Sequence, residues 1–293
     1  GWASASLMPG NDYILREGAP VGVIRGYKSD GFYTVDDFNY VNGVYTLKEG
    51  VPDIQSNVFT NYPKPAEIQV PAGQSAFPGA LKIKDTHKDG IINEEDVVEL
   101  GNVMAHHTGG FGFSGNYKNF DFSANFTYQI GGKVYNASAM CEYTGGKEPG
   151  IGKNKRDFIR DCFQLYDVRN GELVVVTDPT ELAALNRNAT RPVPYYEANT
   201  VLSDFIEDAS FLRLSNLTIG YSFPKTLLKK AYIQSARVYV TGGNLFCITG
   251  YSGLDPEVST NGAAGNSGYP TPGLDYGSYP RSRTFTVGLN LTF

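Results

Sequence analysis

The segment at 120–130, FDFSANFTYQI, alternates apolar and polar residues without a break. Successive side chains of a β-strand point to opposite faces of the sheet, so this pattern predicts a long strand with one apolar and one polar face. The segment just before it, GGFGFSGNY at 109–117, alternates in phase, and Lys118-Asn119 supplies a tight turn between the two. Together they predict a β-hairpin.

Four further segments have the residue types of strands. FLRLSNLTIGYSF at 211–223 and RTFTVGLNLTF at 283–293 alternate clearly, and PVGVIRGYKSDGFY at 20–33 is a weaker candidate. SARVYVTGGNLFCIT at 235–249 is rich in β-branched and aromatic residues, and its Gly-Gly pair predicts a bend or a bulge. With the hairpin, these segments bring the expected number of strands to about six.

The connections between these strands are very unequal. Short links follow residues 117 and 223, whereas the links over 34–107, 131–209 and 250–281 are long. Short and long links alternate along the chain, which is typical of outer-membrane barrels with short periplasmic turns and long external loops. A polar face toward the lumen and an apolar face toward lipid also suit a large barrel.

We therefore expect an all-β fold: an antiparallel segment of about six strands from a large transmembrane β-barrel with long external loops. A soluble β-protein is the alternative, because alternating strands occur in every half-buried antiparallel sheet. The edge strands of the expected segment begin near Pro20 and at 283–293, and each should pair with a strand that this sequence lacks.

Composition and motifs exclude several classes of protein. The 25 Lys and Arg against 30 Asp and Glu give a net charge of −5, which argues against non-specific nucleic-acid binding. No apolar stretch approaches the roughly 18 residues of a transmembrane helix. The sequence has no GxSxG, HExxH or P-loop motif and no GxGxxG behind a strand, so we expect no enzymatic activity.

The cysteines and the first residues bear on cellular location and completeness. Cys141, Cys162 and Cys247 form no CxxC motif, and whether Cys141 and Cys162 pair outside the cytoplasm stays open. The opening GWASASLMPG has neither the basic nor the apolar region of a signal peptide. We expect this sequence to be cut from a longer chain.

Several segments resemble a known family. FIEDASFLRLSNLTIGYSFP (205–224), VYVTGGNLFCITGYSGLDPEV (238–258) and GLDYGSYPRSRTFTVGLNLTF (273–293) are similar to the terminal barrel segments of SusC/RagA-type TonB-dependent outer-membrane transporters. The final Phe293 resembles the signal read by the barrel assembly machinery. The preceding family segments are matched in the same order by three stretches: GAPVGVIRGYKSDGFY (18–33), KIKDTHKDGIINEEDVVELGN (82–102) and GGFGFSGNYKNFDFSANFTYQIGGKVYN (109–136).

The resemblance implies a function and partners. Such transporters are barrels of about 22 strands with an N-terminal plug. They import oligosaccharides, and in some members peptides, across the outer membrane of Gram-negative Bacteroidetes-like bacteria. The TonB complex drives them, and a SusD-like surface lipoprotein assists. Residues 1–293 would be the C-terminal portion of such a barrel, without plug, TonB-contacting segment or remaining strands. The competing hypothesis is a secreted or surface glycan-binding or adhesive β-sandwich.

A second motif, DTHKDGIINEED at 85–96, has the spacing of a calcium-binding loop, with Gly90 at the sharp turn. Ile91 would offer its carbonyl, and His87 and Lys88 do not suit a hard cation. The alternative is an acidic turn, held by its own hydrogen bonds, that leads into a short helix over NEEDVVEL. The candidate Ca²⁺ ligands are Asp85, His87, Asp89, Ile91, Asn93 and Asp96.

The expected external loops are rich in tyrosine. Aromatic rings stack on the apolar faces of sugars while their hydroxyls form hydrogen bonds, so these residues suit glycan capture. Loop packing or an interfacial aromatic girdle is the alternative for each of them. The segment 152–168 additionally predicts a short amphipathic helix. The candidate ligand-binding residues are Tyr195, Tyr196, Tyr251, Tyr269, Tyr276 and Tyr279.

Overall fold

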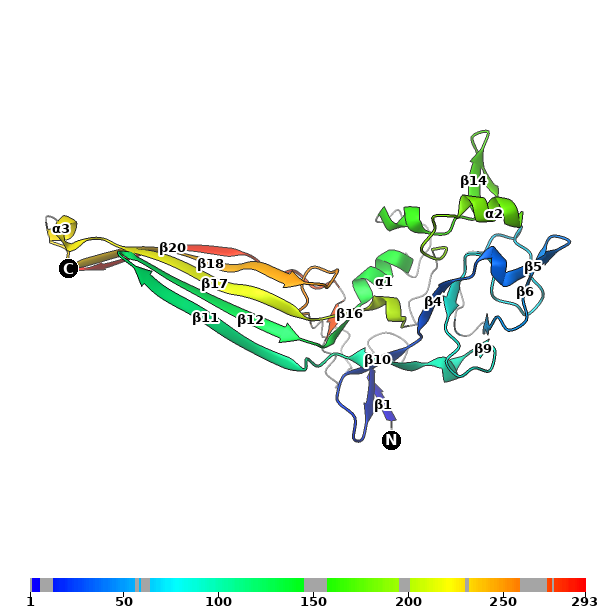
Figure 1. Cartoon of the computed structure of the whole chain (residues 1–293), viewed down its shortest axis with the longest axis horizontal. Coiled ribbons are helices and arrows are strands. Elements are labelled where there is room, and N and C mark those ends of the chain that lie inside the picture. Colours follow the sequence, from blue (N-terminus) through cyan, green and yellow to red (C-terminus); the bar gives the residue numbers. More distant parts are fainter. Residues whose placement is uncertain are drawn as a thin grey trace. The chain divides into compact units, whose positions relative to one another are not determined.

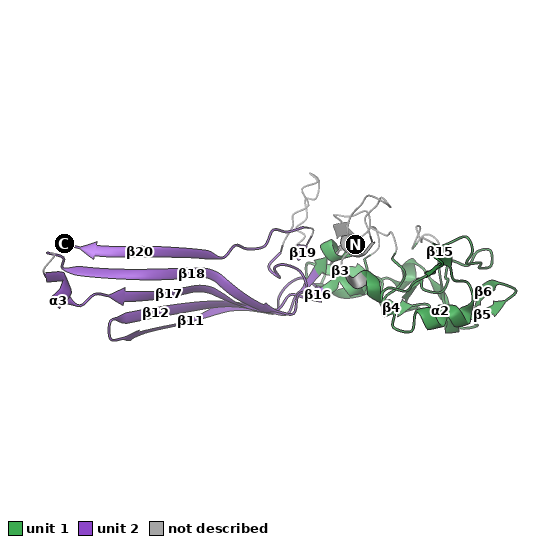
Figure 2. Ribbon diagram, turned by 90° about the horizontal axis from the view of Figure 1, so that it is seen from above, with its two compact units in different colours: residues 1–101, 135–206, 261–271 green, residues 102–134, 207–260, 272–293 purple. Residues whose placement is uncertain are grey.

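The computed structural model divides the chain into two compact units, which are described separately (Figure 2). Unit 1 comprises 1–101, 135–206 and 261–271, and unit 2 comprises 102–134, 207–260 and 272–293. The structure describes residues 2–5, 13–55, 58, 64–144, 157–194, 201–229, 232–258, 273–275 and 277–293. Within these residues, no helix has the length and apolar character needed to cross a membrane.

Unit 2 contains one five-stranded antiparallel sheet with the order β11-β12-β17-β18-β20 (Figure 1). Its members are the long strands that the alternating segments predict. Within the described residues β11 and β20 form its two edges. The bounds are β11 His107–Tyr117, β12 Phe120–Ile130, β17 Phe211–Ser222, β18 Ser235–Thr249 and β20 Thr284–Thr292.

Two local features of this sheet confirm expectations from sequence. β11 and β12 form the predicted hairpin, and Lys118 in its turn has a φ of 54°. The Gly-Gly pair of β18 lies next to a bulge, because the register with β17 shifts between Leu214 and Asn216. At that point Asn244 has a φ of 53°, a left-handed conformation that Asn adopts more readily than most residues.

The expected strand at 20–33 is not part of this sheet, so the prediction of its place was wrong. The segment forms two short strands in unit 1, β3 (Val23–Gly26) and β4 (Ser29–Phe32), which pair in different sheets. Val23 and Ile24 are both buried although they are neighbours, so the segment has no solvent face of its own. The second edge of the long sheet is therefore β11.

The residues of unit 1 belong largely to connections that the sequence predicts as long loops. They form short strands and helical turns around a core that includes Ile68, Phe77 and Leu81. Two buried tyrosines satisfy their hydroxyls within the unit, since Tyr33 donates to the Pro52 carbonyl at 2.6 Å and Tyr45 to the Thr177 carbonyl at 2.7 Å. These connections are thus a packed structure rather than extended loops.

The remaining strands are short and form several small sheets. The pairings are β1-β2-β3-β10, β16-β13-β19, β4-β8, β5-β6, β7-β9 and β14-β15. The bounds are β1 Trp2–Ala5, β2 Tyr13–Arg16, β5 Phe38–Val41, β6 Val44–Leu47, β7 Asp53–Ile54, β8 Leu81–Ile83, β9 Ile91–Ile92, β10 Val98–Asn102, β13 Lys133–Asn136, β14 Tyr166–Arg169, β15 Glu172–Val175, β16 Ile206–Asp208 and β19 Leu274–Asp275.

The helices are also short. In α2, Asp178 caps the N-terminus by accepting from the backbone N–H groups of Thr180 and Glu181 at 2.9 and 3.0 Å, and Pro179 occupies the first helical position. The bounds are α1 Ala137–Thr144, α2 Pro179–Leu185 and α3 Lys225–Leu228, with 3₁₀ turns η1 Val35–Asp37, η2 Glu94–Asp96, η3 Asp157–Asp161 and η4 Ser203–Phe205.

The predicted helix over 152–168 is wrong for the part that the structure describes. After the η3 turn the chain enters strand β14, which pairs with β15. The turn between them is Asn170-Gly171, with φ values of 53° and 84°, as a tight hairpin turn requires. This Asn-Gly pair is a hairpin signal that outweighs the helical spacing of the apolar residues.

Candidate functional site

One face of the five-stranded sheet is apolar across its whole width. The register places Phe122 of β12 opposite Ile219, Ile219 opposite Val240, and Val240 opposite Val287. Residues directly opposite one another share a face. Between 45% and 72% of each of these four residues is exposed. An exposed apolar surface of this extent marks a contact with something other than water.

The apolar face carries aromatic pairs on either side of this row. Next to the β11–β12 turn, Tyr117 lies opposite Phe120, and Phe120 opposite Tyr221. Toward the other end, Phe111 lies opposite Phe126, and their rings stack with centroids 5.0 Å apart. Tyr117 and Phe111 are separated by about 20 Å along β11 at ~3.4 Å per residue. The face therefore is apolar along its length and has aromatic side chains near both ends.

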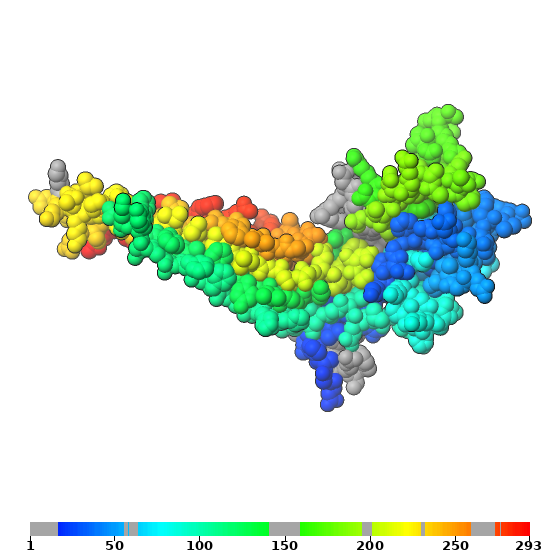
Figure 3. All heavy atoms as spheres, in the orientation of Figure 1, coloured from blue at the N-terminus to red at the C-terminus, as the bar shows by residue number. Residues whose placement is uncertain are grey.

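The opposite face of the same sheet is polar. The hydroxyls of Thr218 and Thr241 lie 2.8 Å apart, and Asn125 lies opposite Asn216. The five strands can be followed side by side in Figure 3, from green (β11 and β12) through yellow (β17) and orange (β18) to red (β20). The sheet thus has one apolar and one polar face.

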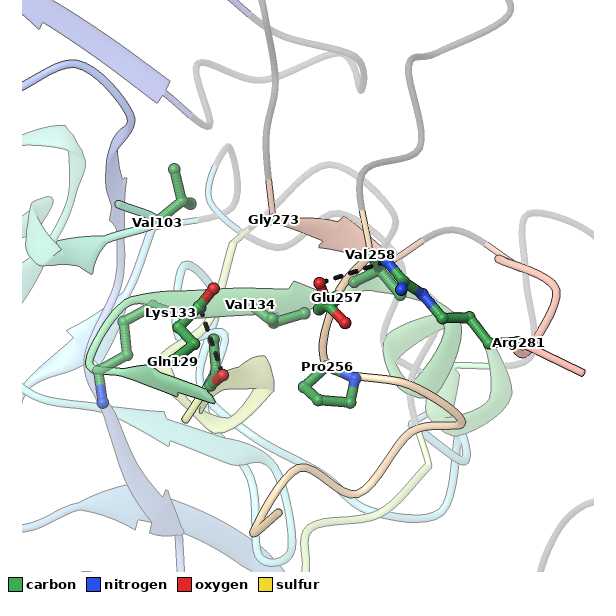
Figure 4. Close-up of a pocket in the computed structure, with 10 residues that line it drawn as sticks. Val103, Gln129, Lys133, Val134, Pro256, Glu257, Val258, Gly273 and Arg281 are labelled. Atoms are coloured by element: carbon green, nitrogen blue, oxygen red, sulfur yellow. Dashed lines mark hydrogen bonds and ion pairs between the residues drawn. The ribbon is translucent and has the colours of Figure 1, made fainter. Parts of the chain in front are cut away.

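A pocket of about 250 Å³ lies in unit 2 among residues that flank the ends of β12, β17 and β18. Figure 4 shows its charged side chains, of which Glu257 and Arg281 form an ion pair at 3.3 Å. Lys133 lies 3.5 Å from Asp208. The lining residues are Val103, Gln129, Lys133, Val134, Ala209, Pro256, Glu257, Val258, Gly273 and Arg281.

Beside this pocket, Arg213 of β17 is buried on the polar side of the sheet. Its Nη2 donates to Asp255 Oδ1 at 2.7 Å, and its Nη1 donates to Asn244 Oδ1 at 2.6 Å. Its Nε lies 3.1 Å from Glu257 Oε2 as an ion pair, without the alignment of a hydrogen bond. Arg213 thereby joins β17 to the bulge of β18 and to the segment that follows β18.

Sequence reasoning did not single out Arg213. The signal was the single charged residue of FLRLSNL, a segment whose apolar residues suit lipid or a protein core. A charged side chain that is buried in this way needs a charged partner, and the carboxylates of Asp255 and Glu257 supply it.

The tyrosines predicted to bind ligand fall into different environments. Tyr251 is buried with Val134, Ala209 and Val258, and its hydroxyl donates to Asp275 Oδ2 at 2.6 Å. Burial and this bond raise the pKa of Tyr251, and the packing alternative describes it better than an open sugar platform. Tyr279 is 91% exposed. Outside the described residues lie Tyr195, Tyr196, Tyr269 and Tyr276.

The predicted calcium loop is closed by side chains that accept backbone hydrogen bonds. Asp85 Oδ2 accepts from Gly90 N–H at 2.8 Å, and Asp89 Oδ1 accepts from Ile91 N–H at 2.9 Å. Asn93 Oδ1 accepts from the N–H of Glu95 at 2.7 Å. An ionised carboxylate has about four lone-pair positions, so these bonds leave Asp85 and Asp89 further acceptor capacity.

Asp96, at the last position of the loop, is fully buried. Its carboxylate accepts from the backbone N–H groups of Thr86 at 2.7 Å, His87 at 3.0 Å and Asn93 at 2.9 Å. Burial by itself raises the pKa of Asp96, but these hydrogen bonds to the ionised form outweigh it and lower the pKa below its usual value. Asp96 thus holds the loop together from within.

Three exposed side chains converge on the outside of this loop. Ligand atoms of His87, Asp89 and Glu95 lie within 4.8 Å of one another, and His87 Nε2 is 3.5 Å from Glu95 Oε2. The structure therefore brings together two of the predicted ligands with a third that the spacing did not indicate. The helix expected after the loop is the single 3₁₀ turn η2, and strand β10 follows it.

Comparison with known proteins places this geometry in a family. No family model matches the sequence. The chain is 31% identical over 280 residues to TonB-dependent receptor P3 of Formosa agariphila, covering 96% of this chain and 23% of that protein. It is 43% identical over 90 residues to TonB-dependent receptor SusC of Bacteroides thetaiotaomicron, covering 30% of this chain and 8% of that protein.

Solved structures show the same fold. A structure of the RagAB peptide transporter matches 99% of this chain and 24% of that chain with a TM-score of 0.60 at 19% identity. A structure of the RagAB peptide importer in its closed state gives a TM-score of 0.59 at 21% identity. The chain spans about a quarter of the length of the proteins that it matches over most of its residues. The sequence relatives and the shared fold identify this chain as part of a SusC/RagA-type TonB-dependent transporter, with its antiparallel sheet as a segment of the barrel.

Proposed function

We propose that this chain forms part of the wall of an outer-membrane β-barrel that imports nutrients into a Gram-negative, Bacteroidetes-like bacterium. The observation that carries the proposal is the two-faced sheet of unit 2. Its strands have 9 to 15 residues, and a transmembrane β-strand needs about 9 to 11. Its exposed apolar face, with aromatic side chains near both ends, has the pattern of a surface that meets lipid between two membrane interfaces.

The proposal includes a substrate class and partners. The names of the relatives support import driven by TonB, which would act through parts of the transporter outside this chain. The cargo would be an oligosaccharide, or a peptide as in the RagAB peptide importer. A SusD-like surface lipoprotein would assist its capture. Residues 1–293 would form the C-terminal portion of the barrel.

The same observation disfavours a glycan-binding β-sandwich. A sandwich buries the apolar face of each sheet against a second sheet about 10 Å away. In the described part of the chain, Phe285 and Val287 of β20 are 71% and 72% exposed, so no second sheet covers them. A lipid-facing role explains this exposure.

Two neighbouring substitutions on β20 test the proposal in the full-length transporter that contains this segment. Val287 and Thr286 are both exposed but lie on opposite faces of the sheet. Val287→Arg would put a charge in hydrocarbon, at a cost of about 2–4 kcal/mol near the midplane. Thr286→Arg would put the same charge on the wet face.

We expect Val287→Arg to reduce the amount of folded transporter in purified outer membranes, and Thr286→Arg to leave it near the wild-type amount. Heat-modifiable migration of the folded barrel on gels measures both. If the two variants assemble equally well, the apolar face does not contact lipid. The proposal would then fail, since an exposed valine in water tolerates arginine.

A further inference from the structure

The turns at one end of the five-stranded sheet carry positive charge only. Lys118 lies in the β11–β12 turn, and Lys225 and Lys229 lie in the connection between β17 and β18. All three residues are exposed. Among the described residues of these two turns there is no aspartate or glutamate. We call these three residues the lysine rim.

The lysine rim directly borders the apolar face of the sheet. Lys118 Nζ lies 5.4 Å from the ring centroid of Tyr117, which is 70% exposed. Phe223, 38% exposed, packs edge-on against Tyr221 at 5.3 Å between centroids and leads into the second turn. There, Leu227 of α3 is 65% exposed. Lysine stems can lie along such apolar surface while the ammonium groups stay in water.

The other end of the sheet has a different charge pattern. Three of its cationic side chains, Lys133, Arg213 and Arg281, pair with carboxylates. Two further carboxylates there accept hydrogen bonds, Glu207 from Ser252 and Asp275 from Tyr251. The two turns therefore differ from this end in that their described residues include lysines and no carboxylate.

We propose that the lysine rim binds the headgroups of anionic phospholipids in the membrane leaflet that the short turns face. The proposal rests on the membrane-spanning function proposed above. Cationic side chains at a membrane surface attract anionic lipids. The exposed aromatic row beside them would fix the depth of the turns at the same interface. The positive charge of the lysine rim and its position beside the apolar face both favour an anionic phospholipid as the bound molecule.

The test uses the purified full-length transporter in phosphatidylcholine vesicles that contain spin-labelled phosphatidylglycerol or spin-labelled phosphatidylcholine. Electron paramagnetic resonance gives the fraction of each lipid that the protein immobilises, and the ratio gives the lipid preference. The test variant carries Lys118→Gln, Lys225→Gln and Lys229→Gln. The matched control carries Lys28→Gln, Lys84→Gln and Lys88→Gln, three exposed lysines of unit 1.

We expect the wild type to prefer phosphatidylglycerol. In the test variant this preference should fall at least about fivefold, since one surface lysine changes the affinity for an anionic lipid by about a factor of five. Added salt should weaken the wild-type preference. The control variant should keep the wild-type preference. A variant with arginine at the three rim positions preserves the charge and should also keep the preference, which reports on correct folding.

A wild type without preference, or a test variant that keeps it, would overturn the proposal. The same holds if the control variant loses as much preference as the test variant, because the effect would then be one of net charge. Failure of the membrane-spanning function would look different. In that case the protein would immobilise neither lipid.

Discussion

Asp121 of β12 and Arg237 of β18 form an ion pair across β17, the strand that separates them. Arg237 Nε donates to Asp121 Oδ1 at 2.9 Å. The pair passes over Gly220, where an added Cβ would lie 2.5 Å from both Arg237 Nη2 and Asp121 Oδ1. Gly220 is therefore required for space and not for backbone conformation. The guanidinium carbon also lies 4.9 Å from the ring centroid of Tyr239.

The first prediction follows from this crossing. Gly220→Ala should displace the two side chains and lower the thermal unfolding midpoint of the transporter. Gly250→Ala is the matched control, because nothing lies within 4 Å of a Cβ there. In an Asp121→Asn background the Gly220→Ala effect should shrink, since the two changes remove one interaction. Additive effects would show that Gly220 serves another purpose.

The second prediction concerns Arg213. Arg213→Met would leave Asp255 buried without its cationic partner, and breaking a buried pair in this way costs about 3–5 kcal/mol. Arg281→Gln should cost less than about 1 kcal/mol, because Arg281 is half exposed and its pair with Glu257 is weak. Unfolding of the two variants in denaturant measures the difference. Similar losses would contradict a special role for the buried arginine.

The third prediction separates two roles within the loop at 85–96. If the exposed side chains bind Ca²⁺, Asp89→Ala should lower the melting temperature only when Ca²⁺ is present, because binding stabilises only the folded form. Asp96→Ala should cost about 3 kcal/mol with or without Ca²⁺, because it leaves three backbone N–H groups without their acceptor.

The same aspartate predicts how the loop responds to acid. The pKa of Asp96 is lowered in the folded protein, so its contribution to stability is complete above the unfolded pKa of about 3.9. This contribution to stability should disappear as the pH falls below that value. The Asp96→Asn variant should lack this pH dependence of stability. Identical melting of the wild type with Ca²⁺ and with a chelator would eliminate the calcium site but not this effect.

The fourth prediction contrasts two tyrosines. Tyr251→Phe should destabilise the protein by about 1–2 kcal/mol, because the Asp275 carboxylate loses a buried hydrogen bond. Tyr279→Ala should leave stability unchanged and weaken capture of an oligosaccharide, since its ring is exposed and predicted to stack on sugars. Calorimetric melting and ligand titration distinguish them. Unchanged ligand affinity in Tyr279→Ala would remove that residue from the site.

The long strands could be predicted from sequence because alternation over about ten residues has no other simple explanation. In β12 the pattern alone assigns Phe122 and Ser123 to opposite faces, and the register agrees. The compact unit 1 could not be predicted in this way. Its strand β7 has two residues and pairs with β9, so its place depends on contacts remote in sequence.

The candidate site was only partly predictable for the same reason. The spacing of the loop at 85–96 indicated His87 and Asp89, which do converge, but Asp96 turned inward to the backbone. Spacing alone does not tell which carboxylate oxygens will accept hydrogen bonds from backbone N–H groups. Tyr251 likewise lies in a predicted external loop, and only the structure shows that it packs with Val134, Ala209 and Val258 and donates to Asp275.

A scan of β12 tests most directly whether the sheet separates lipid from a wet interior. Single cysteines replace each residue from Phe120 to Ile130 in the full-length transporter in membranes, and each cysteine is spin-labelled. The label then reports its access to oxygen, which concentrates in lipid, and to a nickel chelate, which stays in water. We predict that Phe122→Cys and its even-numbered neighbours favour oxygen, and that Asn125→Cys and the odd-numbered positions favour the chelate. A chelate-accessible Phe122→Cys with an oxygen-accessible Asn125→Cys, or no alternation at all, would contradict the account.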